Sequence, residues 1–115
     1  MRTIIAGSRN FNNYVIAKSI LDRCLWKPSK ILSGGCKGAD LLGERWAIEN
    51  NIPVEVYPFK KEMGKLGGPL RNIEMAQNAD ACILFILKDA ESKGSHNMLQ
   101  NAIKNKLHLL VAWIA

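Results

Sequence analysis

The sequence predicts an α/β fold, a three-layer sandwich in which a five-stranded parallel sheet is covered by helices on both faces. Short apolar runs alternate along the chain with segments that have helical spacing. The run at 81–87, ACILFIL, has no polar position, which is typical of a strand buried on both faces. Because crossovers between parallel strands are right-handed, we expect strand order 3-2-1-4-5 in a single Rossmann-like domain spanning residues 1–115.

Each expected element follows from local composition. Asn12 or Asn13 can cap the first helix, and Pro69 is suited to open the third. The stretch 60–68 has three glycines and no period, so we expect a loop there. The last strand is expected to be buried, and the last helix to turn Met98, Leu99, Ala102 and Ile103 inward. The expected strands are 2–6, 30–33, 53–58, 81–87 and 107–114, and the expected helices are 12–26, 39–50, 69–79 and 95–105.

Composition narrows the class of protein. The chain has 115 residues, of which 48% are hydrophobic and 23% charged, as in globular domains. No apolar run approaches the roughly 20 residues of a membrane span, and the start does not read as a signal peptide. Cys24, Cys36 and Cys82 lack metal-type spacing, so we expect reduced thiols in the cytoplasm, with no metal and no cofactor. The net charge of +6 suits a polyanion, but no run of Lys and Arg singles out nucleic acid.

Four polar segments are expected to meet at one edge of the sheet. The first strand is followed by GSRNF, the second by SGGCKGAD and the fourth by KDAESKGSHN, while Arg71 and Asn72 lie in the first turn of the helix at 69–79. In this architecture ligands bind beyond the carboxyl ends of the strands, where the strand order reverses, here between the first and fourth strands. Glycines, helix starts, cations and hydroxyls together suit a phosphate group.

The candidate ligand-binding residues are therefore the small, cationic and hydroxyl-bearing residues of these segments. They are Gly7, Ser8, Arg9, Ser33, Gly34, Gly35, Lys37, Gly38, Ala39, Asp40, Arg71, Asn72, Lys93, Gly94 and Ser95.

Several of these residues have structural alternatives. Gly34 and Gly35 can form a tight strand-to-helix turn, and Gly38 can pack a helix closely, with no ligand involved. Asp40 can stabilise a helix dipole or order the glycine loop, or it can accept hydrogen bonds from a ribose. Arg71 can pair with Glu74 or Asp80. The convergence of four segments favours a site over these separate explanations.

The segments also carry a family resemblance. GSRNF, LSGGCKGAD with GERWA, GGPLRNIEMAQNADACILF and SKGSHNM occur in order between Ile4 and Val111. Together they resemble the YspA-like branch of the SLOG superfamily. The resemblance implies a Rossmann-like domain that binds nucleotides or nucleotide-derived ligands. The superfamily includes LOG enzymes, which cleave the base–ribose bond of nucleoside monophosphates, as well as DNA-processing proteins and sensors of nucleotide signals.

The resemblance carries over to individual residues unevenly. SGGCKGAD corresponds to the first phosphate loop, and Arg71 matches an arginine of the LOG active site. In AESKGSHNM, Gly94 and Ser95 stand for the Gly-Thr pair of the LOG signature, and the catalytic glutamate falls on Met98. A thioether cannot act as a general acid or base.

Three functions follow, and whether the chain is an enzyme stays open. The first is binding of a nucleotide or nucleotide-derived signal through the glycine-rich loops. The second is a nucleotide N-glycosidase of LOG type, in which Arg71 and a relocated acid, Asp40, Glu44 or Glu62, would act. The third is a nucleic-acid-binding accessory role. The apolar last strand with Trp113, together with LOG-like relatives that assemble, predicts a homo-oligomer.

Overall fold

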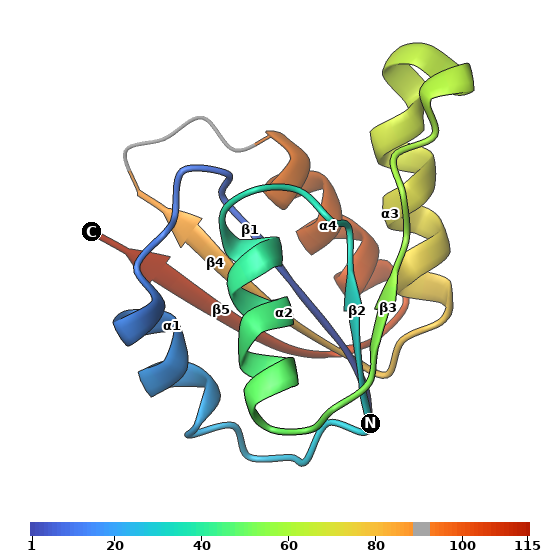
Figure 1. Cartoon of the computed structure of the whole chain (residues 1–115). Helices are drawn as coiled ribbons and strands as arrows, with labels where there is room; N and C mark the ends of the chain where they lie inside the picture. Colours follow the sequence, from blue (N-terminus) through green and yellow to red (C-terminus); the bar gives the residue numbers. More distant parts are fainter. Residues whose placement is uncertain (89–92) are drawn as a thin grey trace.

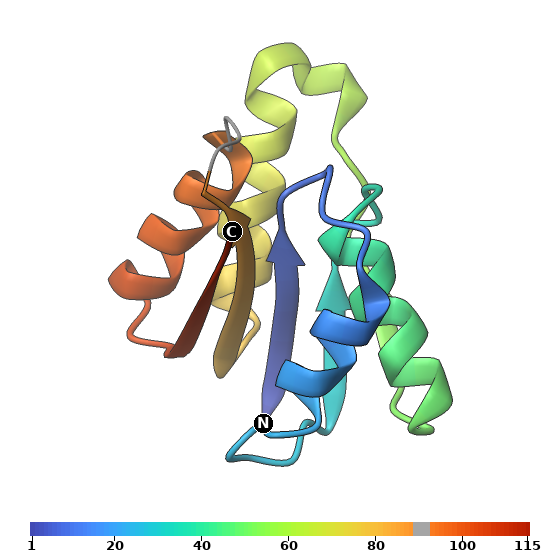
Figure 2. The same cartoon turned by 90° about the vertical axis from the view of Figure 1, so that its left-hand side faces the viewer.

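The computed structural model describes residues 1–88 and 93–115. Its strands form one parallel sheet in the order β3-β2-β1-β4-β5, which confirms the predicted fold class and strand order. Two helices cover each face of this sheet (Figure 1, Figure 2). The strands are β1 (Arg2–Gly7), β2 (Lys30–Ser33), β3 (Val54–Val56), β4 (Ala81–Leu87) and β5 (His108–Ile114). Helices α1 (Tyr14–Leu21) and α2 (Ala39–Glu49) lie on one face, and α3 (Gly67–Gln77) and α4 (Lys93–Lys104) on the other.

The core has two layers because neighbouring residues of a strand point to opposite faces. Ile5 of β1 packs with α1 and α2, whereas the adjacent Ile4 packs with α3 and α4. In β4, Phe85 and Leu84 divide in the same way, and all four side chains are fully buried. Coverage on both faces therefore explains why the central strands are apolar at consecutive positions.

The first helix is shorter than predicted, and the expected extension to residue 26 is wrong. Asn13 caps α1 through a hydrogen bond from the Ile16 amide to its Oδ1 at 3.2 Å, but the helix ends at Leu21. Beyond it, the Trp26 indole N–H donates to Thr3 Oγ1 at 3.0 Å. This hydrogen bond joins the segment after α1 to the start of β1. The helical pattern of the sequence had predicted that this segment continues the helix.

The expected loop at 60–68 is also wrong, because it contains a 3₁₀ helix, η1 (Lys61–Leu66). Helix α3 begins at Gly67, two residues before Pro69. A Cβ atom at Gly67 would lie 2.3 Å from the carbonyl oxygen of Lys60, so this glycine allows the helix start to pass close to the preceding chain. Figure 1 shows η1 and the start of α3 standing above the carboxyl edge of the sheet.

Two expectations about the C-terminal part are wrong as well. Strand β5 is not buried but lies at the edge of the sheet, with Trp113 52% exposed and Leu109 36% exposed. Ile103, expected to face inward, is 62% exposed, whereas Met98 and Ala102 are buried as expected. An apolar run does not tell how many neighbours a strand has, and a helix on a sheet buries only part of its surface.

Candidate functional site

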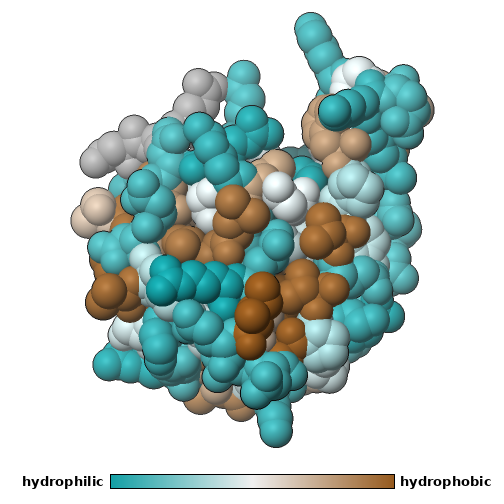
Figure 3. Space-filling view, viewed as in Figure 1, coloured by the Kyte–Doolittle hydropathy of each residue, from teal (hydrophilic) through white to brown (hydrophobic). Residues whose placement is uncertain are grey.

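A cavity of about 620 Å³ opens at the carboxyl edge of the sheet. It lies where β1 and β4 adjoin, which is the point where the strand order reverses. Figure 3 shows hydrophilic side chains on both sides of the hollow beside η1 and the start of α3. The residues that line the cavity are Ala6, Gly7, Ser8, Arg9, Asn10, Gly34, Cys36, Lys37, Asp40, Arg71, Asn72, Met75, Lys93, Gly94, Ser95 and Met98.

The structure brings most of the sequence-predicted residues to this cavity. All four expected segments contribute: the loops after β1 and β2 and the first turns of α3 and α4. Ser33, Gly35, Gly38 and Ala39 are not part of the lining. Residues 89–92, which the sequence also assigned to this cluster, lie outside the described part of the chain.

The glycines after β2 serve contacts within the protein. A Cβ atom at Gly38, where φ is +84°, would lie 2.4 Å from the carbonyl oxygen of Arg9 and 2.5 Å from that of Ser8. At Gly34, it would lie 2.6 Å from Arg71 Nη1 and 2.8 Å from Asp40 Oδ2. The loop after β2 is therefore glycine-rich because the loop after β1 and two charged side chains approach its backbone. Of Gly34 and Gly38, only Gly34 also lines the cavity.

The N–H groups of this loop are largely used by the protein itself. The Gly35 amide donates to Ser33 Oγ at 3.1 Å, and the Cys36 amide donates to Asp40 Oδ2 at 3.2 Å. The Ala39 amide, at the start of α2, donates to the Ser8 carbonyl at 3.2 Å. These bonds shape the loop into a wall of the cavity, to which Lys37 and Asp40 contribute side chains.

Ser33 and Glu44 belong to the support of that wall. The Ser33 hydroxyl donates to Glu44 Oε2 at 2.7 Å while its oxygen accepts from the Gly35 amide. Glu44 does not line the cavity, and Glu62 is exposed on η1, also outside the lining. Among the acids considered for catalysis, Asp40 is the one that the structure places in the cavity wall.

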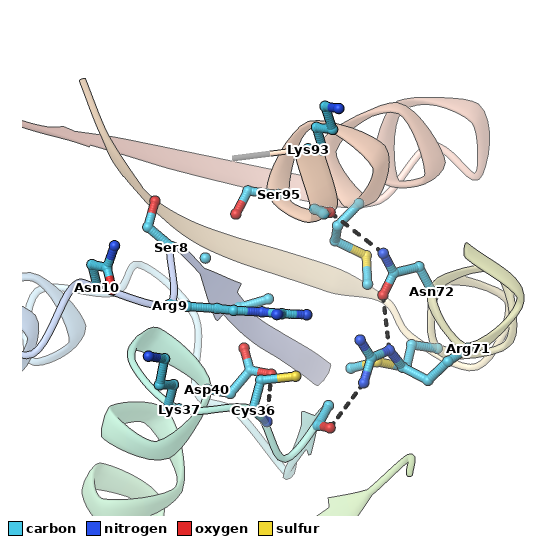
Figure 4. A pocket seen from close by; sticks show the side chains of 16 residues that line it. Ser8, Arg9, Asn10, Cys36, Lys37, Asp40, Arg71, Asn72, Lys93 and Ser95 are labelled. Atoms are coloured by element: carbon cyan, nitrogen blue, oxygen red, sulfur yellow. Dashed lines mark hydrogen bonds between the residues drawn. The ribbon is translucent and has the colours of Figure 1, made fainter. Parts of the chain in front are cut away.

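Arg71 joins three parts of the site. It is only 7% exposed, and its Nη1 donates to the Gly34 carbonyl at 2.8 Å while its Nε donates to Asn72 Oδ1 at 3.0 Å (Figure 4). Asn72 in turn donates to Asn97 Oδ1 at 2.9 Å, which ties α3 to α4. The alternative pairing of Arg71 is not observed, because Glu74 pairs with Lys60 at 3.0 Å and the Asp80 carboxylate accepts from the Arg2 amide.

Asp40 is a buried acid among cations. It is 6% exposed, and burial raises its pKa from 3.8 to about 6, although the Cys36 hydrogen bond and the charges of Arg71 and Arg9 lower it. The hydrogen bond from the Cys36 amide shows that Asp40 orders the glycine loop. Asp40 also lines the cavity, so the same carboxyl group can contact a ligand, which is the other interpretation of this residue.

The start of α4 forms the opposite wall. Lys93, Gly94 and Ser95 line the cavity there, and a Cβ atom at Gly94 would meet none of the described residues within 4 Å. In Figure 4, Arg9 extends across the cavity between α4 and Asp40. The described lining thus combines four cationic side chains with one acid, at a helix N-terminus whose dipole also favours an anion.

The sequence analysis missed Ala6, Asn10, Cys36 and Met75 as lining residues. Met75 follows Arg71 by four positions, so helical spacing was a signal that placed both on one face. Met98 lines the cavity and is 2% exposed, so the residue at the position of the LOG glutamate faces the site as well as the core. Phe11 is a core residue, stacked on Phe85 with ring centroids 5.2 Å apart.

Within residues 1–88 and 93–115, no group of three or more His, Cys, Asp or Glu side chains could hold a metal ion. None of the helices described is long and apolar enough to cross a membrane.

Comparison with known proteins agrees with the resemblance seen in the motifs. The family model described as "YspA, cpYpsA-related SLOG family" matches residues 1–61. The chain is 32% identical over 113 residues to the Gene 61 protein of Mycobacterium phage D29, covering 90% of this chain and 89% of that protein. No solved structure matches the chain.

Proposed function

The chain belongs to the YspA, cpYpsA-related SLOG family, and we propose that its cavity binds a nucleotide-derived ligand through phosphate groups. The observation that carries this proposal is the convergence of Arg9, Lys37, Arg71 and Lys93 on one cavity that holds a single acid, Asp40, among the described residues. Family membership supports the nucleotide class only coarsely, and the charge of the cavity supports an anionic part of the ligand.

We assign the phosphate to the start of α4. The N–H groups of Gly35, Cys36 and Ala39 are already bonded within the protein, whereas a Cβ atom at Gly94 would meet no described residue within 4 Å. A phosphate there would meet the helix dipole and the side chains of Lys93 and Ser95, with Arg9 reaching from across the cavity. Because Arg9 is exposed, its side chain can bind a phosphate with little rearrangement of the fold.

The rest of the cavity suits a sugar and a base. A volume of about 620 Å³ lies within the roughly 300–1,000 Å³ of small-molecule sites, which leaves space beyond one phosphate. Ala6, Met75 and Met98 supply apolar surface, and methionine adapts to flat ring systems. The ionised Asp40 carboxylate can accept hydrogen bonds from ribose hydroxyls.

The first experiment identifies the ligand. Small molecules released from the purified, denatured protein are measured by mass spectrometry, and the protein is titrated calorimetrically with a panel of nucleoside mono- and diphosphates. We expect a phosphate-containing ligand to bind. Failure of every nucleotide and of inorganic phosphate to bind would overturn the proposal.

A pair of variants tests the site. Arg9→Ala removes one charged donor and is expected to weaken binding roughly 10- to 100-fold, because a hydrogen bond to a charged group is worth about 1.5–3 kcal/mol. Arg23→Ala is the matched control, since Arg23 is an exposed cation outside the cavity and its loss changes net charge equally. Equal affinities of the two variants would show that the cavity is not the binding site.

One observation favours a second candidate function, a nucleotide N-glycosidase. Asp40 lines the cavity with a pKa raised to about 6, so part of it is protonated near neutral pH, as a general acid for a leaving base requires. Chromatography of adenosine monophosphate incubated with the protein tests this candidate. Release of adenine that Asp40→Asn abolishes would establish it, and its absence would leave the binding function alone.

A further inference from the structure

An apolar surface lies on the side of α4 that faces away from the cavity. It consists of the outer edge of β5 and the adjoining flank of α4, and we call it the α4–β5 edge. Figure 2 shows β5 beside α4 at the open side of the sheet. Its exposed apolar side chains are Ile103 at 62%, Trp113 at 52% and Leu109 at 36%.

The flanks of α4 have different partners. One flank faces α3, since Asn72 of α3 donates to Asn97 and to the Gly94 carbonyl. The buried stripe contains Ser95, Met98 and Ala102. At 100° per residue, the stripe formed by His96 and the apolar residues Leu99 and Ile103 falls on the flank opposite α3. The His96 ring lies 6.4 Å from the Trp113 ring, which confirms that this flank adjoins β5.

The outer edge of β5 presents backbone groups that β4 does not use. The His108 amide donates to the Asp80 carbonyl at 3.0 Å, and the Ile114 carbonyl accepts from the Lys88 amide at 2.9 Å. In a parallel ladder alternate residues bond to the same neighbour. The N–H and C=O groups of Leu109, Val111 and Trp113 therefore point away from β4. Within the described residues no strand lies beyond β5 in the sheet.

This edge lacks the features that ordinarily prevent strand pairing. Edge strands usually carry lysine, proline, a bulge or inward-pointing charge, whereas β5, HLLVAWI, has no Asp, Glu, Lys, Arg or Pro. The chain as a whole carries a net charge of +6, so most contacts between two copies would bring cations together. Because β5 itself carries no lysine or arginine, pairing through β5 does not bring cations of this strand together.

We propose that two copies of this chain associate through the α4–β5 edge, with β5 pairing antiparallel to β5 of the partner subunit about a two-fold axis at Val111. Because Leu109, Val111 and Trp113 all direct their backbone groups outward, Val111 forms a hydrogen-bonded pair with its own counterpart. Trp113 then lies opposite Leu109 of the partner subunit, on the face that carries α4. The seven residues of the strand give a paired edge of about 23 Å.

The partner is a second copy because the edge is complementary to itself in this register. The large exposed side chain of Trp113 meets the smaller Leu109 of the partner subunit, and the same contact repeats across the axis. The flanks with Ile103 then face each other on one side of the joined sheet and enclose these side chains. Such a contact is isologous and closes at two copies. The antiparallel arrangement turns the two carboxyl edges, and so the two cavities, to opposite ends of the dimer.

Variants of matched chemistry test the proposal. Ile103→Lys places a like charge on each side of the axis, and Ile48→Lys is the control, since Ile48 is 71% exposed on α2, far from β5 in the sheet order. Val111→Pro removes an N–H group that points away from β4, so no hydrogen bond to β4 is lost. Proline is tolerated at such positions of edge strands. Mass is measured by light scattering and sedimentation equilibrium at micromolar concentration, with circular dichroism to verify folding.

We expect the wild type and Ile48→Lys at twice the chain mass of 12.8 kDa, and Ile103→Lys and Val111→Pro at the chain mass. If Val111→Pro does not fold, Ile103→Lys decides alone, because that side chain is exposed. A monomeric wild type overturns the proposal, and so does a dimer that Ile103→Lys leaves intact. Both results are independent of nucleotide binding, because the α4–β5 edge does not line the cavity.

Discussion

Replacing Asp40 by asparagine should change how stability depends on pH. Asp40 is 6% exposed, and burial raises its pKa from 3.8 to about 6. In the unfolded chain the carboxyl group returns to its ordinary pKa. Between these two values the folded protein therefore binds more protons than the unfolded chain, so the contribution of Asp40 to stability is present below about pH 4 and is lost as pH rises through about 6.

The size of this loss follows from the shift. A difference of roughly two pKa units corresponds to about 3 kcal/mol, at about 1.4 kcal/mol per unit. Asparagine has nearly the same shape, keeps an oxygen for the Cys36 amide and does not ionise. The unfolding free energy of Asp40→Asn minus that of the wild type should therefore rise by about 2.4 kcal/mol between pH 4 and pH 7, which is most of the full difference.

Urea unfolding of both proteins at several pH values measures this difference. Other titrating groups are common to the two proteins and cancel, provided that the slopes against urea agree. Glu44→Gln is the control, since Glu44 lies beside the same loop but outside the cavity lining. A difference that stays constant between pH 4 and pH 7, or falls, would refute the argument that burial dominates the titration of Asp40.

Two further predictions concern the walls of the cavity. Gly38→Ala should lower the unfolding free energy by about 2 kcal/mol or more, since φ is +84° and the added Cβ meets the Arg9 carbonyl, whereas Gly94→Ala should leave it unchanged or higher by up to about 1 kcal/mol. Equal urea midpoints for the two variants would contradict this. The affinity for sulfate, measured by calorimetry, should rise in the wild type as pH falls from about 7 to about 5, because Asp40 loses its negative charge, and should change less in Asp40→Asn. A parallel rise in both proteins would assign the effect to other groups.

The strand order could be predicted from the sequence because it depends on patterns that one sheet enforces. Ile4, Ile5 and the run at 81–87 are apolar at consecutive positions, which only a sheet covered on both faces satisfies. Element ends were less predictable. Helix α1 ends at Leu21, and the chain after it is held by a contact between Trp26 and Thr3, which are distant in sequence. The start of α3 depends on the close approach of Gly67 to Lys60, which composition presents only as one more glycine.

The site was predictable to the extent that topology alone assembles it. Carboxyl ends of parallel strands meet, so Arg9, Lys37 and Asp40 were expected together before any side chain was placed. The role of each glycine was not predictable, because glycine is required equally where a ligand approaches the backbone and where another loop approaches it. The structure distinguishes the two cases: a Cβ atom at Gly38 would meet the Arg9 carbonyl, whereas one at Gly94 would meet none of the described residues within 4 Å.

Under the proposed binding, the two walls of the cavity contribute to recognition in different ways. In the wall after β2, the Gly35 and Cys36 N–H groups and the Gly34 carbonyl are already bonded within the protein, so these backbone groups are not offered to a ligand. At the start of α4, a Cβ atom on Gly94 would meet no described residue within 4 Å, and the helix dipole favours an anion. Because α4 meets the cavity with Ser95 and Met98 but turns Ile103 to the opposite flank, a substitution on one stripe can change ligand binding without touching the surface proposed for self-association.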